Sequence, residues 1–193
     1  MSVSYSDVIL PFFGKDSFLS NHHPSPISIG NEHFFCVEQY YKVCEARLFN
    51  DGDMAQAMME SSDAGHIKRM SRRIKNYNED TWDQKKVEVM CEALSAKFTQ
   101  NPNLCSQLIA TGNKMLVEAS QSDDFWGIGL SKTAMRRTLP LAWPGANMLG
   151  TLLMALRSRL RANERRLQRL AKLARVSAAR RKARKQRSVK RLH

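Results

Sequence analysis

The chain has 193 residues and a formal net charge of +13, and its apolar runs are short. A membrane-spanning helix needs about 20 consecutive apolar residues, so a transmembrane protein is excluded. The first seven residues are polar and lack the basic patch and apolar stretch of a secretion signal. We therefore expect a cytoplasmic or nuclear location.

The positive charge is confined to the end of the sequence. Residues 161–193 contain 14 Lys and Arg and one acidic residue, Glu164, whereas residues 1–160 contain 17 of each sign. A domain of about 160 residues buries enough apolar surface to fold without metal or disulfide. The sequence therefore predicts a neutral domain at 1–160 and a basic tail at 161–193.

The cysteines and histidines do not show the spacing of metal ligands. The four cysteines contain no C-x-x-C pair, and Cys44 and Cys91 fall on the apolar faces of predicted helices. This placement favours reduced, buried thiols over a disulfide framework or a zinc site. His22 and His23 lie in a Pro-rich loop with no third ligand at suitable spacing. We expect neither a metal nor a cofactor.

The N-terminal third predicts a small β element followed by helices. Two apolar runs flank Gly30-Asn31, a pair suited to the tight turn of a hairpin. From Glu38 the apolar residues recur every three to four positions, which predicts a helix that stops at residues 50–52. Two shorter helices are expected at 53–60 and 63–74, the second with Asp63 as N-cap.

The strongest helical pattern covers residues 80–98 and predicts one long helix. Asn101-Pro102 is a typical helix start, and Gly112 a typical stop. Residues 115–117 predict a short strand that leads into a Gly-rich loop at 120–129 and an irregular segment to residue 145. The last helix begins near Asn147. The fold class is mainly α (α+β), a compact single helical domain with a small N-terminal β element.

The segment 118–129 concentrates acidic, small and aromatic residues in a loop. Trp126 lies between acidic residues and two glycines, outside any helical or alternating pattern. It either stacks on a base or ring or packs the loop onto the core. In the first case the glycines let the backbone approach a ligand, and Asp123 is placed to bond a sugar hydroxyl.

Two further segments combine charges in ways that packing does not fully explain. Glu38, Lys42 and Glu45 are spaced four and three apart and share one helix face. That face is either solvated or carries a carboxylate aimed into a pocket. The basic segment 68–73, which includes Lys68 and Arg72, is either solvent-facing or holds a phosphate.

Taken in chain order, these segments resemble the NADAR superfamily, the YbiA-like N-glycosidases. The resemblance extends over about residues 8–160. It rests on Phe18-Leu-Ser-Asn21, Val37-Glu-Gln-Tyr-Tyr41, Lys68-Arg-Met-Ser-Arg72, Ala96-Lys-Phe98, Leu116-Val-Glu-Ala-Ser120, Asp123-Asp-Phe-Trp-Gly-Ile-Gly129 and Asn147-Met-Leu-Gly150.

The resemblance implies cleavage of an N-glycosidic bond between a ribose 5-phosphate or ADP-ribose unit and a base or amine. Members of the family are associated with reactive intermediates of the riboflavin pathway and with removal of ADP-ribose from guanine in nucleic acid. The expected catalytic residues are Glu38, Lys42 and Asp123. The expected substrate-binding residues are Ser20, Asn21, Arg72, Glu118, Trp126, Gly127, Gly129 and Asn147. A nucleotide sugar is the expected substrate.

One position departs from the family pattern. The family usually has a Lys seven residues after the catalytic Glu, proposed to attack the opened sugar as a Schiff-base amine, and this chain has Glu45 there. A carboxylate cannot form an imine. Three outcomes stay open: a glycosidase that uses Glu38 and water, one that uses Lys42 instead, and an impaired module that binds ADP-ribose or a nucleotide.

The tail begins with an apolar three-four spacing that continues the last helix to about Val176. Beyond it, residues 180–187 are a cluster of positive charge that we expect to be disordered alone. Such a cluster suits the phosphates of DNA or RNA, or nuclear import. An acidic membrane surface and a calmodulin-like partner are the alternatives.

Overall fold

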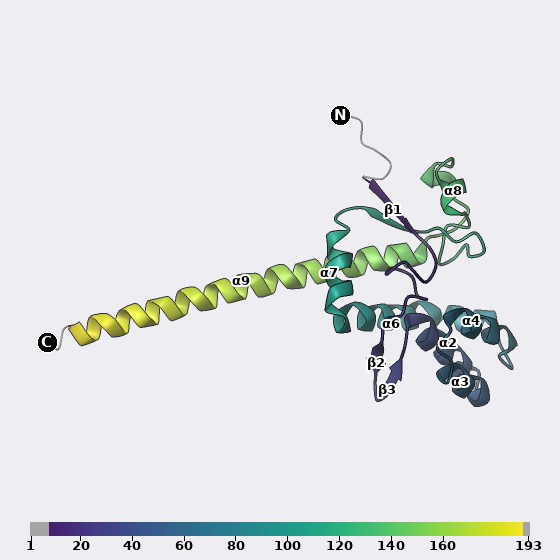
Figure 1. Ribbon diagram of the computed structural model, residues 1–193, viewed down its shortest axis with the longest axis horizontal. Coiled ribbons are helices and arrows are strands. Elements are labelled where there is room, and N and C mark those ends of the chain that lie inside the picture. Colours follow the sequence, from purple (N-terminus) through teal and green to yellow (C-terminus); the bar gives the residue numbers. More distant parts are fainter. Residues whose placement is uncertain (1–7, 191–193) are drawn as a thin grey trace. The chain divides into compact units, whose positions relative to one another are not determined.

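The computed structural model describes residues 8–190, with side chains through residue 177. Contacts divide the chain into two compact units, Met1–Leu156 and Arg157–His193. The first unit is mainly helical with two small sheets, which confirms the predicted fold class (Figure 1). Within residues 8–190, no helix combines the length and the low charge that a membrane span requires.

The β structure consists of two separate strand pairs. β2 (Ile27–Ile29) and β3 (Glu32–Phe34) form the antiparallel hairpin expected around Gly30, whose φ is 60°. β1 (Ile9–Phe12) runs parallel to β4 (Met115–Glu118). The sequence indicated the strand near residue 115 but not its partner, because a four-residue apolar run does not specify what it pairs with.

The first helices form as expected. α2 (Val37–Leu48) packs against α3 (Gly52–Met59), α4 (Ala64–Met70) and α6 (Lys86–Gln100). The Asp63 side chain accepts a hydrogen bond from the His66 amide at 3.0 Å, so Asp63 is the N-cap of α4. The short 3-10 helix η1 (Ser71–Arg73) follows directly.

The single helix predicted over 80–98 is wrong. The structure has α5 (Glu79–Asp83) and then α6, separated at residues 84–85. The break places Trp82 against Tyr41, with ring centroids 5.0 Å apart. Gln84, Lys85 and Lys86 are all good helix formers, so local preference gave no sign of it.

The prediction of buried thiols was correct only in part. Cys36 is buried, Cys44 and Cys105 are half-buried, and Cys91 is exposed on α6. All four cysteines lie within the described residues, and no disulfide joins them.

The second half of the first unit contains α7 (Pro102–Ala110), β4 and two short helices, α8 (Lys132–Met135) and η2 (Pro140–Ala142). Asn101 precedes Pro102 as expected, but its side chain does not cap α7. It donates instead to the carbonyls of Pro26 and Lys97, which ties the hairpin to α6. Gly112 ends the helix with a φ of 66°.

The final helix, α9, runs over Met148–Lys190. It therefore includes residues past Val176, where we expected disorder. This part is rich in Ala, Arg and Lys, which favour helix, and it has no Gly or Pro. The side chains of the basic cluster 180–187 lie outside the described residues, so its partner stays a prediction.

Candidate active site

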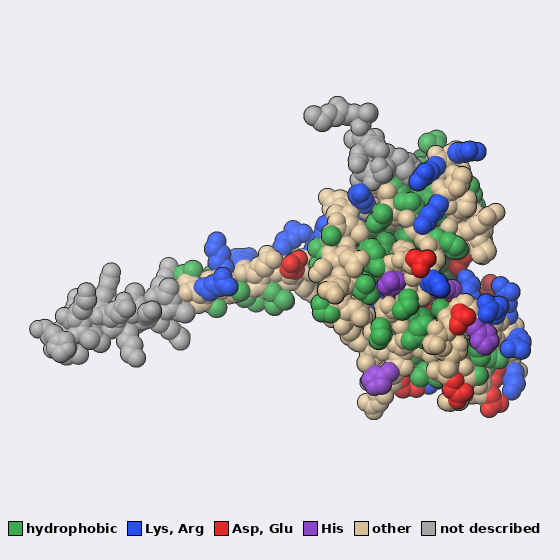
Figure 2. Space-filling view, in the orientation of Figure 1, with side chains coloured by type: hydrophobic (Ala, Val, Ile, Leu, Met, Phe, Trp, Pro, Cys, Tyr) green, Lys and Arg blue, Asp and Glu red, His purple; other side chains and the backbone are tan. Residues whose placement is uncertain are grey.

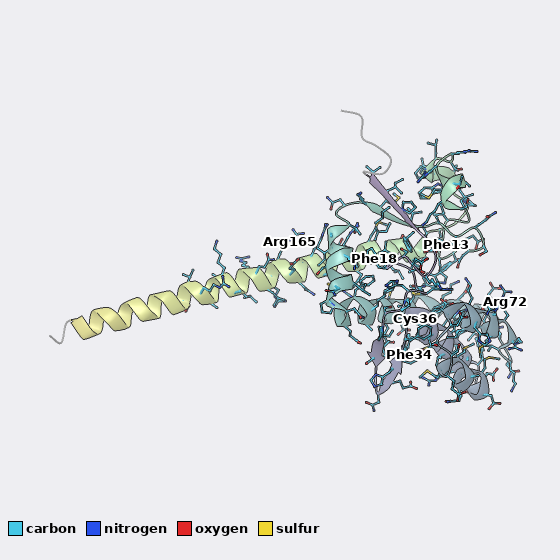
Figure 3. All side chains as sticks on the ribbon, viewed as in Figure 1. Phe13, Phe18, Phe34, Cys36, Arg72 and Arg165 are labelled. Atoms are coloured by element: carbon cyan, nitrogen blue, oxygen red, sulfur yellow. The ribbon has the colours of Figure 1, made fainter. Side chains whose placement is uncertain are left out.

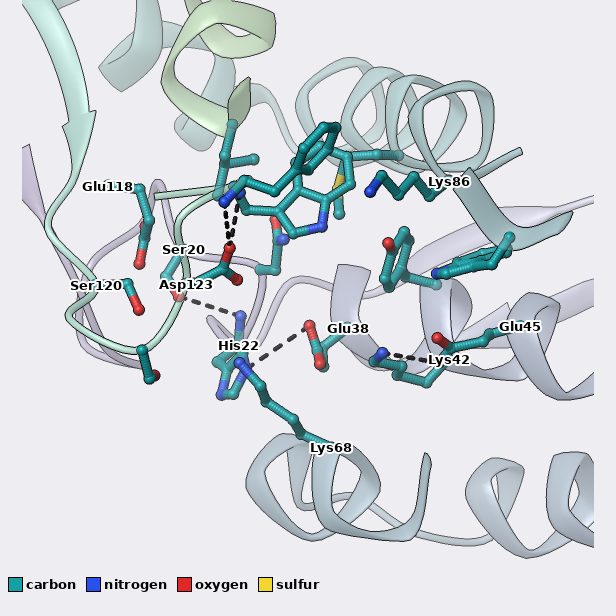
Figure 4. Close-up of a pocket in the computed structure, with 18 of the residues that line it drawn as sticks. Ser20, His22, Glu38, Lys42, Glu45, Lys68, Lys86, Glu118, Ser120 and Asp123 are labelled. Atoms are coloured by element: carbon teal, nitrogen blue, oxygen red, sulfur yellow. Dashed lines mark hydrogen bonds and ion pairs between the residues drawn. The ribbon is translucent and has the colours of Figure 1, made fainter. Parts of the chain in front are cut away.

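The site is a cleft of about 480 Å³ in the first unit. One wall is α2, and the wall that faces it is formed by the end of β4 and the loop after it (Figure 4). Further lining residues come from the loop 13–22, α4, α5 and the start of α6, together with Tyr77 and Leu149.

Glu38 lies in the first turn of α2, where the amide dipoles of the helix favour a carboxylate. Its side chain is buried, and its backbone amide donates to the Asn21 carbonyl at 3.0 Å. His22 Nε2 lies 3.7 Å from Glu38 Oε2. The hydrogen bond between the Glu38 amide and the Asn21 carbonyl fixes the loop 20–22 to the start of α2. The His22 side chain therefore lies beside the Glu38 carboxyl.

Lys42 and Glu45 follow Glu38 on the same face of α2, and all three line the cleft. Lys42 Nζ donates to Glu45 Oε2 at 2.7 Å. Burial raises the pKa of the Glu45 carboxyl, and the charge of Lys42 opposes that rise. The pair is thus an ion pair largely withdrawn from solvent, and the cleft face of α2 is not a solvated one.

The opposite wall is shaped by the side chain of Asp123. Its Oδ1 accepts hydrogen bonds from the amides of Trp126 at 2.7 Å and Phe125 at 3.2 Å, which closes a tight turn. Gly127 is required here, because a Cβ on it would lie 2.9 Å from the carbonyl oxygens of Asp123 and Glu118. Gly129 adopts a φ of 68°, which favours glycine.

Glu118 is the last residue of β4. Its side chain is buried at the cleft, and Oε2 has no hydrogen-bond partner among the described residues. Burial raises its pKa to about 8; Asp123 adds to the rise, and Lys68 and Lys132 oppose it. Asn21 Oδ1 is also buried without a partner among the described residues. The cleft thus contains two buried polar atoms that the described part of the chain leaves without a hydrogen bond.

Aromatic side chains provide the apolar surface of the cleft. Trp126 packs edge-on against Tyr41, with ring centroids 5.7 Å apart, and Tyr41 packs on Trp82 at 5.0 Å. Phe125 contacts Trp126 edge-on, and Lys86 Nζ lies 3.6 Å from the centre of the Phe125 ring. Trp126 is half-buried and lines the cleft, so it both packs the loop and presents surface to a ligand.

Lys97 of α6 supports the site from behind. It is fully buried and donates to the Ser20 carbonyl at 2.8 Å. Burial lowers its pKa to about 7. Lys97 was part of the family resemblance but was not predicted as a site residue. Its place on the apolar side of an amphipathic helix could have indicated a buried role.

The structure brings seven of the eleven predicted site residues together in the cleft: Ser20, Asn21, Glu38, Lys42, Glu118, Asp123 and Trp126. The other four do not line it. Arg72 is exposed in η1 and points outward (Figure 3), and Lys68 is the residue of that basic segment that reaches the cleft. Gly127 and Gly129 shape the loop. Asn147 holds β4, accepting from the Glu118 amide and donating to the Leu116 carbonyl.

Several cleft residues were not predicted as site residues. His22 was considered only as a metal ligand, yet it faces Glu38. Lys86 and Ser120 also line the cleft. His22 directly follows the predicted Ser20-Asn21 pair, so its position in the chain could have indicated it; nothing in the sequence pattern indicated Lys86.

Comparison with known proteins identifies the family. The model of the NADAR domain matches residues 9–161. N-glycosidase R617 of Acanthamoeba polyphaga mimivirus is 41% identical over 124 residues, which are 64% of this chain and 73% of that protein. The riboflavin biosynthesis protein VVA0006 of Vibrio vulnificus is 33% identical over 143 residues, 74% of this chain but only 35% of that protein.

A solved structure agrees with this. The NMR structure of the E. coli protein YbiA superimposes with a TM-score of 0.66 at 28% identity, covering 82% of this chain and 88% of YbiA. The sequence match, the shared fold and the cleft lie in the same part of the molecule. The chain therefore belongs to the NADAR domain family.

Proposed function

We propose that this chain hydrolyses the N-glycosidic bond between a ribose phosphate or ADP-ribose unit and a base or amine. The observation that carries the proposal is Glu38, a buried carboxylate at a helix N-terminus in a cleft lined by aromatic rings and cations. The name N-glycosidase that R617 bears supports the reaction class.

The geometry supports the chemistry of the bond. Departure of the base leaves positive charge on the sugar, and a fixed carboxylate nearby stabilises that charge. Glu38 also serves as the base that takes a proton from the attacking water. The faces of Trp126 and Tyr41 bury an aromatic base or the rings of a nucleotide.

Water, and not a lysine amine, is the nucleophile in this proposal. Imine formation needs an amine that is free to attack a carbonyl, whereas Lys42 Nζ donates to the buried Glu45 Oε2 at 2.7 Å and is engaged in an ion pair. Glu45 itself occupies the position of the family lysine. The chain therefore retains the carboxylate and replaces the amine.

The lysines of the cleft support a phosphorylated substrate. Lys68 and Lys86 both line it, and charge-assisted hydrogen bonds to phosphate oxygens are strong. Phosphoribosyl intermediates of the riboflavin pathway and ADP-ribosylated guanine are the two substrate types that we propose. The name riboflavin biosynthesis protein that VVA0006 bears supports the first type.

The test is a substrate panel with wild type and Glu38→Gln assayed side by side. Wild type is expected to release ADP-ribose from an ADP-ribosyl-guanine oligonucleotide, or ribose 5-phosphate from an aminopyrimidine ribosyl phosphate. Glu38→Gln is expected to lose at least about 10³-fold in kcat, since it removes both charge stabilisation and the base. No release from any N-ribosyl substrate by wild type would refute the proposal.

A second candidate is a binding module without turnover, and the Lys42–Glu45 ion pair favours it because it engages the amine on the face of α2 that carries Glu38. In this case the protein binds ADP-ribose or a nucleotide, which calorimetry detects. Absence of binding heat in wild type would exclude it.

For the tail we propose binding to the phosphate backbone of DNA or RNA, with the domain boundary near residue 160. Figure 2 shows Lys and Arg side chains along one side of the described part of α9 and hydrophobic side chains along the other. Arg161, Arg165 and Arg169 are spaced four apart in α9, which places them on one helix face, and Leu167 and Leu170 are exposed.

Removal of residues 161–193 tests the tail. Because each neutralised phosphate releases counterions, binding through the tail gives a steep dependence of affinity on salt. The truncated chain is expected to bind an oligonucleotide with a much flatter slope. An unchanged slope would refute the proposal, and selective binding of anionic vesicles by the full chain would favour a membrane partner.

A further inference from the structure

Glu118 has the environment of a carboxyl group that keeps its proton. It is 8% exposed, and Oε2 is buried with no hydrogen-bond partner among the described residues. An ionised carboxylate without hydrogen bonds is costly to bury. A protonated carboxyl in the same place is far less so, and it has a proton to donate to whatever enters the cleft.

Charges of both signs surround Glu118. Asp123 in the loop and Glu38 on α2 favour the neutral acid, whereas Lys68 on α4 and Lys132 on α8 favour the carboxylate. Glu118 forms no ion pair within the part of the chain that the structure describes. Burial therefore decides its state and raises the pKa to about 8.

The backbone holds Glu118 in place on both sides. Its amide donates to Asn147 Oδ1 at 3.0 Å, and its carbonyl accepts from the Ile128 amide at 3.0 Å. In the strand pair it lies opposite Phe12. The carboxyl is thus presented from a fixed strand end, on the wall that faces Glu38 (Figure 4).

Asp123 does not offer the same capability, because its Oδ1 accepts two backbone amides and shapes the loop. Glu45 is occupied by Lys42. Of the carboxyl groups that line the cleft, Glu118 is the one with a buried oxygen that the described residues leave unpartnered.

We propose that Glu118 is the general acid of the reaction and gives its proton to the leaving nitrogen, opposite Glu38 as the base. This role rests on the proposed hydrolase function. The bond between C1′ and nitrogen breaks, both electrons go to nitrogen, and nitrogen takes the Glu118 proton. Water adds to C1′ and gives its proton to Glu38, and transfer of that proton to Glu118 through solvent restores the starting state.

The first experiment measures the protonation state without any substrate. In protein labelled with ¹³C at the glutamate side-chain carboxyl carbons, one resonance is expected to titrate near pH 8. That resonance should be missing in Glu118→Gln and present in Glu60→Gln, a matched control at an exposed position outside the cleft. Titration of Glu118 in the ordinary range near pH 4 to 5 would overturn the proposal.

The second experiment varies the leaving group. Guanine linked through its exocyclic nitrogen must be protonated to leave, whereas nicotinamide departs from its mononucleotide as a neutral base without a proton. Glu118→Gln is expected to lose about 10²- to 10⁴-fold in kcat on the ADP-ribosyl-guanine oligonucleotide. On nicotinamide mononucleotide the fold-loss in kcat is expected to be smaller by a factor of at least about ten. Equal losses on the two substrates would assign Glu118 a merely structural role and overturn the proposal.

The pH profile separates this proposal from the proposed function. An acid must be protonated to act, so wild-type kcat/KM is expected to fall as pH rises through about 8, and the residual activity of Glu118→Gln to lack that limb. If wild type is active and Glu118→Gln shows the same fall in kcat/KM above pH 8, the acid role alone is overturned. A wild type inactive on every substrate would overturn the hydrolase function, and the acid role with it.

Discussion

The two walls of the cleft manage their charges in different ways. On the α2 wall each carboxylate faces a basic side chain, His22 for Glu38 and Lys42 for Glu45. On the β4 wall Asp123 accepts backbone amides, and Glu118 is left alone. Burial raises the pKa of both Glu45 and Glu118, but only for Glu45 does an ion pair within the described residues oppose the rise. The difference teaches that two walls of one cleft can give their carboxyl groups different electrostatic environments.

The largest expected effect comes from breaking the support of the β4 wall. Asn147→Ala removes the side chain that bonds the Glu118 amide and the Leu116 carbonyl. Two buried backbone groups lose their partners, at about 1 to 3 kcal/mol each. We expect a loss of several kcal/mol in the free energy of unfolding, measured by urea denaturation. A loss below about 1 kcal/mol in the free energy of unfolding would show that the β4 wall does not depend on the Asn147 hydrogen bonds.

A smaller effect is expected from the aromatic surface between the walls. Trp126→Ala removes a stacking face, and stacking of a base on an aromatic ring contributes about 1 to 3 kcal/mol. ADP-ribose affinity should fall by roughly 5- to 100-fold in calorimetry. Trp143→Ala removes a tryptophan outside the cleft lining and serves as the control. Equal affinity in wild type and Trp126→Ala would place the ligand elsewhere.

The smallest effect is expected from Lys42 on the α2 wall. If water is the nucleophile, Lys42→Met removes only the partner of Glu45, and kcat should fall less than about tenfold. Cyanoborohydride should trap no sugar adduct on wild type, as mass spectrometry of the intact protein would show. A trapped adduct that Lys42→Met abolishes would assign the amine chemistry to Lys42 and contradict the use of water.

Features set by contacts between residues close in the sequence could be predicted, whereas features set by contacts between distant residues could not. Local preferences were enough for the Gly30 turn, the Asp63 cap and the face of α2 that carries Glu38, Lys42 and Glu45. The break between α5 and α6 accompanies the contact of Trp82 with Tyr41, and these two residues are far apart in the sequence. The hydrogen bonds from Asn147 to β4 are likewise tertiary contacts. No hydrophobic periodicity or sequence motif shows which backbone amide a buried asparagine will bond.

The raised pKa of Glu118 could not have been predicted from local sequence preferences. Glu118 was expected to bind substrate, and its residue type fits that role. Its isolation depends on which side chains surround the end of β4 in three dimensions: Asp123, Lys68 and Lys132 come from three different segments. The resemblance to the family indicated the position, and burial indicates the protonation state.

The pairing of β1 with β4 has a consequence for the order of folding. Ile9 aligns with Met115 and Phe12 with Glu118, so this strand pair closes a loop that contains most of the first unit. Contacts of such long sequence separation form slowly, because the entropy of the intervening chain must be lost first. During synthesis the α2 wall can form as soon as its helices emerge, but the cleft can be completed only after β4, the loop with Asp123 and Trp126, and Asn147 have left the ribosome.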